Sequence, residues 1–454
     1  MNTSTTPPND SSAPAASTDS TLVIGQVEQF LQDVITRLEP TEFEEEGAGP
    51  GRPRVLPALC MWAGLLVCIL RGFSSQLALW RLLAMGGLWL YPRFPISDEA
   101  VYKRLAQADI APLEKLFADI SALLRQHLAP FAQEDLAPFA SQVVALDETT
   151  LDPVARMLPA LRGLPPGDKR LLPGKLAGLF DLRYQQWLHI RHIPDPAQNE
   201  KVIARDLLQP LSQGSLILAD LGYFAFAWFD HLTEMGHWWI SRLRAKTSYT
   251  VLHAYYQAED TFDGIVYLGA YRADRAAQAV RLVRFRVGPA TYTYITNVLD
   301  PQVLPLAEIA RLYARRWDIE MAVKLVKRHL GLHLLWSGKD VVVLQQVLGV
   351  LIISQILQAL RLEIAGRVQV DPFDVSLDLL VKYMPQQAYT GQDPVALFVT
   401  LGRELGFIRP SRRTVIRAPV IPPDQMKPLP PDLALTRTAR YAGRNCGPRP
   451  RNAN

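Results

Sequence analysis

The feature that most constrains the fold is a pair of short apolar runs, each followed at once by an aspartate. Residues 142–146 read Gln-Val-Val-Ala-Leu and precede Asp147, and residues 215–219 read Ser-Leu-Ile-Leu-Ala and precede Asp220. Short continuous apolar runs of this kind, bounded by polar residues, are typical of buried strands. We therefore expect two buried strands that each end at a carboxylate.

Further strands and helices alternate with these two runs. Their order is three strands, helix, strand, helix, strand, which predicts an α/β fold built on a mixed sheet. Residues 247–300 hold β-favouring runs split by glycines and predict a strand-rich insertion. The expected strands are 142–146, 175–180, 187–193, 215–219 and 238–243, and the expected helices are 199–211, capped by Asn199, and 225–235.

The part of the chain before this unit has a different character. Residues 1–25 are rich in Ser, Thr, Pro and Ala and lack the pattern of a signal peptide, so we expect them to be disordered. Residues 26–138 predict an all-helical N-terminal domain, in which Ser97 or Asp98 caps one helix. The segment 97–105 loosely resembles a helix-turn-helix, which suggests DNA binding; a purely structural helical bundle is the open alternative.

The part after the α/β unit, which we place at residues 139–370, is shorter. Residues 371–408 predict a small helical region. The tail at 409–454 is rich in proline and holds ten Arg and Lys against two Asp. We expect a disordered basic arm able to touch DNA phosphates, or else a solvated tail without a defined role.

Composition describes an ordinary globular protein, with 49% hydrophobic residues and a net charge of +4. The three cysteines form neither a disulfide framework nor a zinc pattern. The apolar run 55–70 has 16 residues, fewer than the roughly 20 that a membrane span needs, and the run 341–360 contains four glutamines. Both runs predict packed helices of a cytoplasmic protein without a membrane, and a membrane protein is the alternative.

A third feature lies in residues 312–330, which predict one helix. At about 100° per residue, Tyr313, Arg316, Glu320 and Lys327 fall within an arc of roughly 60°, beside a separate apolar stripe. A carboxylate among cations suits a site where a metal ion meets phosphates, because Arg and Lys bind phosphate oxygens. The alternative is an exposed helix face with i,i+4 salt bridges.

The two aspartates also suggest a metal site. If their strands are neighbours, Asp147 and Asp220 point into one crevice, and a divalent cation would relieve the repulsion between them. Two unrelated aspartates at strand ends are the alternative. Glu148 is expected to be a bystander or to support the site indirectly.

The spacing Tyr313-x2-Arg316-x3-Glu320-x6-Lys327 resembles the Y-R-E-K signature of insertion-sequence transposases of the "IS-four" group, in the DDE superfamily. Asp147 and Asp220 resemble the two catalytic aspartates of that family, and Asp220-x-Gly222-Tyr223 resembles its second motif. The resemblance covers about residues 142–360.

This resemblance implies a ribonuclease-H-like fold in which Asp147, Asp220 and Glu320 are catalytic and hold two Mg²⁺ (or Mn²⁺) ions. Tyr313 and the two cations of the signature, Arg316 and Lys327, would bind DNA beside the cut. The implied reaction is strand cleavage and strand transfer at terminal inverted repeats of double-stranded DNA, by a homodimer in the cytoplasm at the nucleoid. A metal-dependent nuclease without strand transfer is the alternative.

The sequence departs from some relatives in the insertion. Those relatives cut through a hairpin and hold a flipped base with a tryptophan there. No tryptophan lies between Trp239 and Trp317 in this chain. The residues that could stack on a base instead are Tyr255, Tyr256, Tyr292 and Tyr294. A hairpin route therefore does not follow from the sequence.

Overall fold

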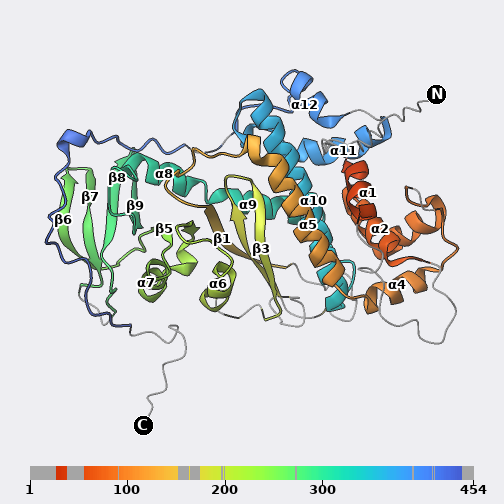
Figure 1. Ribbon diagram of the computed structural model, residues 1–454, viewed down its shortest axis with the longest axis horizontal. Helices are drawn as coiled ribbons and strands as arrows, with labels where there is room; N and C mark the ends of the chain where they lie inside the picture. The colour runs from red at the N-terminus through yellow and green to blue at the C-terminus, as the bar shows by residue number, and fades with distance from the viewer. Residues whose placement is uncertain are drawn as a thin grey trace, which may run out of the picture.

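The computed structural model describes residues 27–37, 56–89, 92–151, 163, 174–195, 198, 200–270, 274–390, 393–411, 413 and 415–441. Within these residues one mixed sheet of nine strands runs from β6 at the left edge of the molecule to β3 near its middle, and a group of helices that includes α10 and α5 lies beyond β3 (Figure 1). The strands are β1 (Val143–Thr150), β2 (Lys175–Asp181), β3 (Gln186–Ile193), β4 (Leu216–Ala219), β5 (Trp238–Arg242), β6 (Tyr249–Gln257), β7 (Thr261–Leu268), β8 (Val280–Val287) and β9 (Ala290–Thr296).

The strand order in the sheet is β3-β2-β1-β4-β5-β9-β8-β7-β6. Strands β1, β4 and β5 are parallel, β2 runs antiparallel to β1, and β3 runs antiparallel to β2. The expected insertion supplies β6 to β9, and β9 pairs with β5. The insertion therefore extends the central sheet instead of forming a separate one.

Helices cover both faces of the first five strands, and β2 and β4 are buried along their whole length. Helices α6 (Glu200–Leu208) and α7 (Phe226–Glu234) pack on one face. Asn199, the expected cap of α6, lies outside the described residues. The other face carries α5 (Ala111–Leu128), α8 (Leu306–Ala314), α9 (Trp317–Lys324) and α10 (Asp340–Val368).

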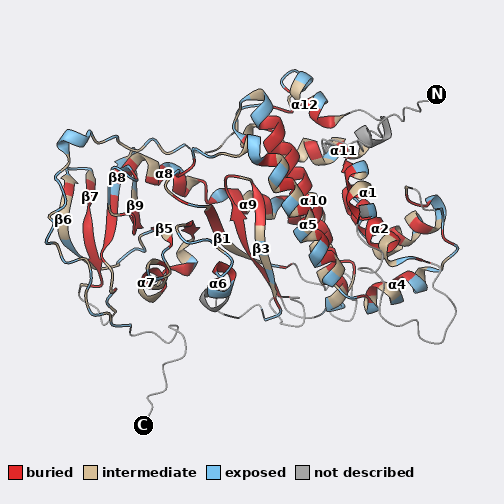
Figure 2. Ribbon diagram, viewed as in Figure 1, coloured by how far each residue is buried: buried red, intermediate tan, exposed pale blue. Residues whose placement is uncertain are grey.

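The N-terminal helices are α1 (Val27–Arg37), α2 (Ala58–Leu70), α3 (Gln76–Arg81) and α4 (Asp98–Gln107). The Ser97 hydroxyl caps α4 by accepting a hydrogen bond from the Ala100 amide. These helices and α5 share one buried core with α10 and with one face of the sheet (Figure 2). Because that core is continuous, the residues predicted as a helical domain do not pack as an independent unit.

Helix α10 passes through the middle of this core. It is the one described helix long and apolar enough to cross a membrane, yet 78% of its most apolar window is buried inside the protein. Its buried glutamines bind backbone groups of neighbouring segments: Gln345 donates to the Leu105 and Ala108 carbonyls, and Gln346 accepts from the Trp336 amide. These contacts are those of a core helix.

The chain ends in two short helices and a long extended segment. Helices α11 (Leu377–Thr390) and α12 (Pro394–Leu401) pack near the upper end of α10 (Figure 1). The segment 415–441, which we call the C-terminal strap, then crosses the insertion. Leu433 and Leu435 of the strap pack on Tyr255 and Tyr267.

The strap corrects the expectation of a disordered basic arm for this part of the tail. The Lys427 amide donates to the Tyr255 carbonyl, the Ala279 amide donates to the Leu435 carbonyl, and the Tyr441 hydroxyl donates to Asp230. The sequence signal failed because charge and proline content describe solubility, whereas the strap is held by backbone hydrogen bonds and alternate leucines. Residues 442–454 lie outside the described residues.

Candidate active site

The two strand-end aspartates lie on neighbouring parallel strands. Leu146 of β1 pairs with Ala219 of β4, so Asp147 and Asp220 occupy the next position on each strand. Neighbouring strands are about 4.8 Å apart. Asp220 directly follows β4 as expected, but β1 continues through Asp147 to Thr150, because its second half pairs with β2.

Alternation along the strands places both carboxylates on one face of the sheet. Val143 and Ala145 face the core that holds α9 and α10, and Asp147 continues this series. Glu148 falls on the opposite series, and its carboxylate forms a buried ion pair with Lys175 at 2.5 Å. The structure thus gives Glu148 a partner away from Asp147.

The expected single helix at 312–330 is interrupted. Helix α8 ends at Ala314, α9 begins at Trp317, and residues 325–329 form a π-helical turn. At the break the Asp318 amide donates to the Arg315 carbonyl instead of to the Ala314 carbonyl. The sequence pattern alone missed the break, since every residue from 312 to 330 is compatible with a helix.

Three of the four signature residues lie around the break. Tyr313 is in the last turn of α8, Arg316 lies between the helices, and Glu320 is in α9, which packs against β1. Arg316 donates to the Glu320 carboxylate at 2.7 Å. Arg316 is buried, whereas the Glu320 side chain is 31% exposed, so Glu320 is free to reorient toward solvent.

Asp147 and Glu320 line one cleft of about 770 Å³. The remaining lining residues include Glu148 and Thr149 of β1 and several cations. Lys327 extends across this cleft, and its ammonium donates to the Thr150 carbonyl at 2.8 Å. The lining cations are Lys324, Lys327, Arg328 and His333, the last a cation only when protonated.

Electrostatics couple the three carboxylates. The pKa of Asp147 is raised from 3.8 to about 6, chiefly by burial and to a smaller extent by the negative charges of Glu320 and Asp220. The Glu148 amide, which donates to the Asp147 carboxylate at 2.8 Å, and the charge of Arg316 act in the opposite direction. The charges of Glu320 and Asp220 therefore affect the pKa of Asp147, although the three acids come from distant parts of the chain.

Arg316 balances this negative charge. Burial by itself would lower the pKa of Arg316, but the hydrogen bond to Glu320 and the charges of Tyr313, Asp220 and Glu320 raise it overall. Within the described residues, no three His, Cys, Asp or Glu side chains lie close enough together to hold a metal ion as they stand. In this arrangement the guanidinium of Arg316 balances the negative charge of Glu320.

Tyr313 is buried, whereas the sequence predicted a side chain that contacts DNA. Its ring lies tilted against Tyr294 with centroids 5.1 Å apart, and its hydroxyl donates to the Ala219 carbonyl at 3.4 Å. Burial raises the pKa of Tyr313 to about 12, so the phenol stays protonated at neutral pH. Tyr313 therefore forms part of the floor beside Asp220.

Sequence reasoning did not single out three further residues of the cleft wall, Lys324, Arg328 and His333. Lys324 follows Glu320 by one helical turn and was visible as a flank of the same helix face. Arg328 and His333 reach the cleft because the π-helical turn at 325–329 and the turn after it redirect the chain. No periodicity in the sequence marks that change of direction.

Comparison with known proteins finds two similarities to transposases. A family model described as "Transposase DDE domain" matches residues 163–355, a range that contains Asp220 and Glu320 and begins after Asp147. The transposase for insertion sequence element IS231F of Bacillus thuringiensis subsp. israelensis is 23% identical over 286 residues. Over these parts, the chain is similar to the DDE transposases of insertion sequences.

The match to this relative is partial, covering 51% of this chain and 59% of the Bacillus transposase. Among solved structures, a piggyBac transposase synaptic complex with hairpin DNA aligns at a TM-score of 0.40 and 10% identity, over 87% of this chain and 84% of that chain. The relationship to insertion-sequence transposases rests on the family match and the Bacillus relative.

The four tyrosines of the insertion that the sequence offered for stacking on a base differ in their burial. Tyr255 and Tyr294 are buried, at 3% and 2% exposure, and are unable to stack on a base without rearrangement. Tyr256 and Tyr292 are half-buried. These two remain the candidates within the insertion.

Proposed function

We propose that this protein is a DNA transposase that cleaves and joins DNA strands at the inverted-repeat ends of an insertion sequence, with Asp147, Asp220 and Glu320 as its catalytic carboxylates. The observation that supports the proposal is the placement of three sequence-distant acids near the same end of β1 and β4. Two lie in register on parallel neighbouring strands, and the third lines the same cleft as Asp147. The family relationship points to the same reaction class.

A ribonuclease-H-like fold is supported by the topology of the first five strands. Their order is β3-β2-β1-β4-β5. The pairs β3–β2 and β2–β1 are antiparallel, and the pairs β1–β4 and β4–β5 are parallel. Helices cover both faces of this unit. We infer that the sheet of the insertion, β6 to β9, is an addition to that core.

The donor set fits hard divalent cations. All three acids offer oxygen ligands, which Mg²⁺ and Mn²⁺ prefer. The pKa of Asp147 is raised chiefly by burial and also by the charges of Glu320 and Asp220, so a bound cation would favour its ionised form. Two divalent ions, when bound, would activate the attacking oxygen and stabilise the leaving oxygen of a phosphodiester.

The protein's own groups set the conditions for that chemistry. We infer that Glu320 leaves its ion pair with Arg316 when metal binds, because the carboxylate is part-exposed and the pair is formed within one turn of α9. The freed guanidinium would then face a phosphate oxygen, to which it can donate two hydrogen bonds. Lys327, at the cleft wall, would hold a neighbouring phosphate.

The substrate we propose is double-stranded DNA with terminal inverted repeats, bound by a homodimer in the cytoplasm at the nucleoid. The cationic wall of the cleft, formed by Lys324, Lys327 and Arg328, suits a polyanion. Tyr313 would support Arg316 and Asp220 from below, in place of gripping the backbone from the surface.

The test is strand cleavage and joining on linear DNA that carries the inverted repeats flanking the coding region. We expect wild type to nick this DNA with Mg²⁺ or Mn²⁺ and to join the 3′ ends to a second duplex. Glu320→Gln should lose at least a hundredfold in rate with the fold intact, since it removes one metal ligand. Glu308→Gln on α8, whose carboxylate pairs with Arg311 at the surface, is the matched control.

Equal rates for wild type and Glu320→Gln would overturn the assignment of Glu320. Product analysis separates the two reactions of this site. Nicked products without joined products, under conditions that permit joining, would indicate a metal-dependent nuclease in place of a transposase. Joined products that require the terminal repeats support the transposase.

A further inference from the structure

We propose that Arg413, which comes from the chain after α12, is a positioning residue that holds the junction of α8 and α9 and so sets the place of Glu320. The contacts at the junction stand independently of any reaction. Their consequence for metal binding rests on the proposed function.

The break between α8 and α9 leaves a backbone carbonyl without its helical partner. In an uninterrupted helix the Ala314 carbonyl would accept from the amide of residue 318. The Asp318 amide donates to the Arg315 carbonyl instead. Arg413 supplies the missing donor, and its Nη2 lies 2.9 Å from the Ala314 carbonyl oxygen.

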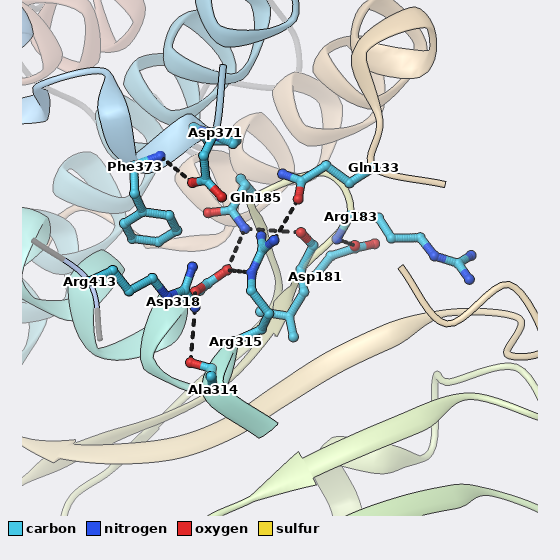
Figure 3. Close-up of polar contacts among 12 residues, drawn as sticks. Gln133, Asp181, Arg183, Gln185, Ala314, Arg315, Asp318, Asp371, Phe373 and Arg413 are labelled. Atoms are coloured by element: carbon cyan, nitrogen blue, oxygen red, sulfur yellow. Dashed lines mark hydrogen bonds and ion pairs between the residues drawn. The ribbon is translucent and has the colours of Figure 1, made fainter. Parts of the chain in front are cut away.

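The same guanidinium also holds the start of α9. Arg413 Nη2 lies 2.6 Å from Asp318 Oδ1 (Figure 3). Asp318 is in the first turn of α9 and its side chain is fully buried. Arg413 therefore bridges the last carbonyl of one helix and a side chain at the beginning of the next.

The carboxylate of Asp318 is shared with other elements. Its Oδ2 accepts from Arg315 at 2.7 Å and from Gln185, in the β2–β3 turn, at 3.0 Å (Figure 3). Arg315 in turn donates to Gln133 at 2.7 Å. The network ties the junction to the sheet, and Asp318 keeps these other donors when Arg413 is removed.

Arg413 itself is fixed from the C-terminal side. Its guanidinium lies 4.6 Å from the centre of the Phe373 ring, and Arg361 lies 4.1 Å from the same ring. The Ser411 amide donates to Asp374 at 2.7 Å. These contacts anchor the stretch around Arg413 to the segment that follows α10.

The geometry has a direct consequence for the site. Tyr313 precedes the break, Arg316 lies in it, and Glu320 follows one turn later. A change in the angle between α8 and α9 would separate Glu320 from Asp147 and from the floor residue Tyr313. Because Arg413 contacts both helices, it is the side chain best placed to fix that angle.

The first experiment measures hydrogen exchange of the peptides that cover residues 312–324 in full-length protein without metal. Arg413→Gln removes the bridge but leaves Asp318 its bonds to Arg315 and Gln185, so the protein should fold. We expect exchange at the junction to become at least tenfold faster. Arg417→Gln, at an exposed arginine four residues further on, is the matched control and should leave exchange unchanged. Unchanged exchange in Arg413→Gln would overturn the inference.

The second experiment measures Mn²⁺ binding to the same proteins by calorimetry, with Glu320→Gln as the reference for loss of the site. The dissociation constant of Arg413→Gln should rise roughly tenfold, as for other residues that orient metal ligands. Arg413→Lys, which keeps the charge and one donor group, should recover part of the affinity. Faster exchange with unaltered Mn²⁺ binding would overturn the role in placing Glu320.

The two measurements also distinguish failure of this inference from failure of the proposed function. If Mn²⁺ binding to wild type is the same as to Glu320→Gln, the proposed function fails. In that case the exchange data decide on their own whether Arg413 holds the junction.

Discussion

At the scale of the residue, Asp147 links the charge of the site to stability. Its folded pKa of about 6 exceeds its ordinary value of 3.8, so the metal-free folded protein binds this proton more tightly than the unfolded chain does. The stabilising effect of the proton is complete below pH 3.8 and is lost as pH rises through 6. Ionised Asp147 therefore destabilises the metal-free protein at neutral pH.

We predict that Asp147→Asn stabilises the metal-free protein above pH 6, by up to about 3 kcal/mol, and has little effect near pH 4. Asparagine keeps an oxygen to accept from the Glu148 amide. Denaturant unfolding at pH 4 and pH 8 checks the prediction. If the variant were less stable than wild type at pH 8 without metal, the ionised Asp147 carboxylate would not be the destabilising group that its raised pKa implies.

A second residue-scale prediction concerns the ion pair of Asp263 and Arg281, whose side chains are fully buried. Arg281 also donates to the Leu304 carbonyl, just before α8. Arg281→Met leaves a buried carboxylate unpaired and should cost about 3–5 kcal/mol of unfolding free energy. The double variant Arg281→Met, Asp263→Leu should recover much of this loss in urea unfolding. A double variant no better than the single one would show that the bond to Leu304 dominates.

At the scale of the element, α10 was predictable and the α8–α9 break was not. The glutamines of α10 distinguished a core helix from a membrane span in the sequence, because each needs a hydrogen-bond partner when buried. At the break the Ala314 carbonyl accepts a hydrogen bond from Arg413, nearly a hundred residues away in the chain. A local pattern carries no information about so distant a donor.

The importance of these glutamines is testable at Gln355. Its side chain accepts from the Trp187 amide at 2.8 Å and donates to the Trp187 carbonyl at 2.9 Å, at the start of β3. Gln355→Leu should cost about 1–3 kcal/mol per unsatisfied backbone group. Chemical denaturation measures the loss, and Gln107→Leu at the exposed end of α4 is the control. A Gln355→Leu protein as stable as the control variant would show that the helix tolerates a purely apolar face here.

At the scale of the whole molecule, the sequence predicted the α/β sheet, the insertion and the strand-end position of Asp220. Each depends on short-range patterns of apolar residues. The single core that joins the N-terminal helices to α10 was not visible, because it is made by contacts between residues far apart in the chain. The same reason explains why the path of the C-terminal strap was missed.

The last prediction concerns how that strap completes the fold. Leu433 and Leu435 cover an apolar cluster on the insertion that includes Tyr255 and Tyr267, and backbone hydrogen bonds hold the strap to β6 and to the segment before β8. Leu435→Asp places a charge in that cluster and should lower the unfolding free energy by about 2–4 kcal/mol. It should also increase binding of a hydrophobic dye, because the cluster opens to water. Val420→Asp, at a strap residue that is 82% exposed, should do neither. If both variants match wild type, the strap rests on the sheet without stabilising it; if only Leu435→Asp changes, the C-terminal segment is an integral part of the sheet's outer surface.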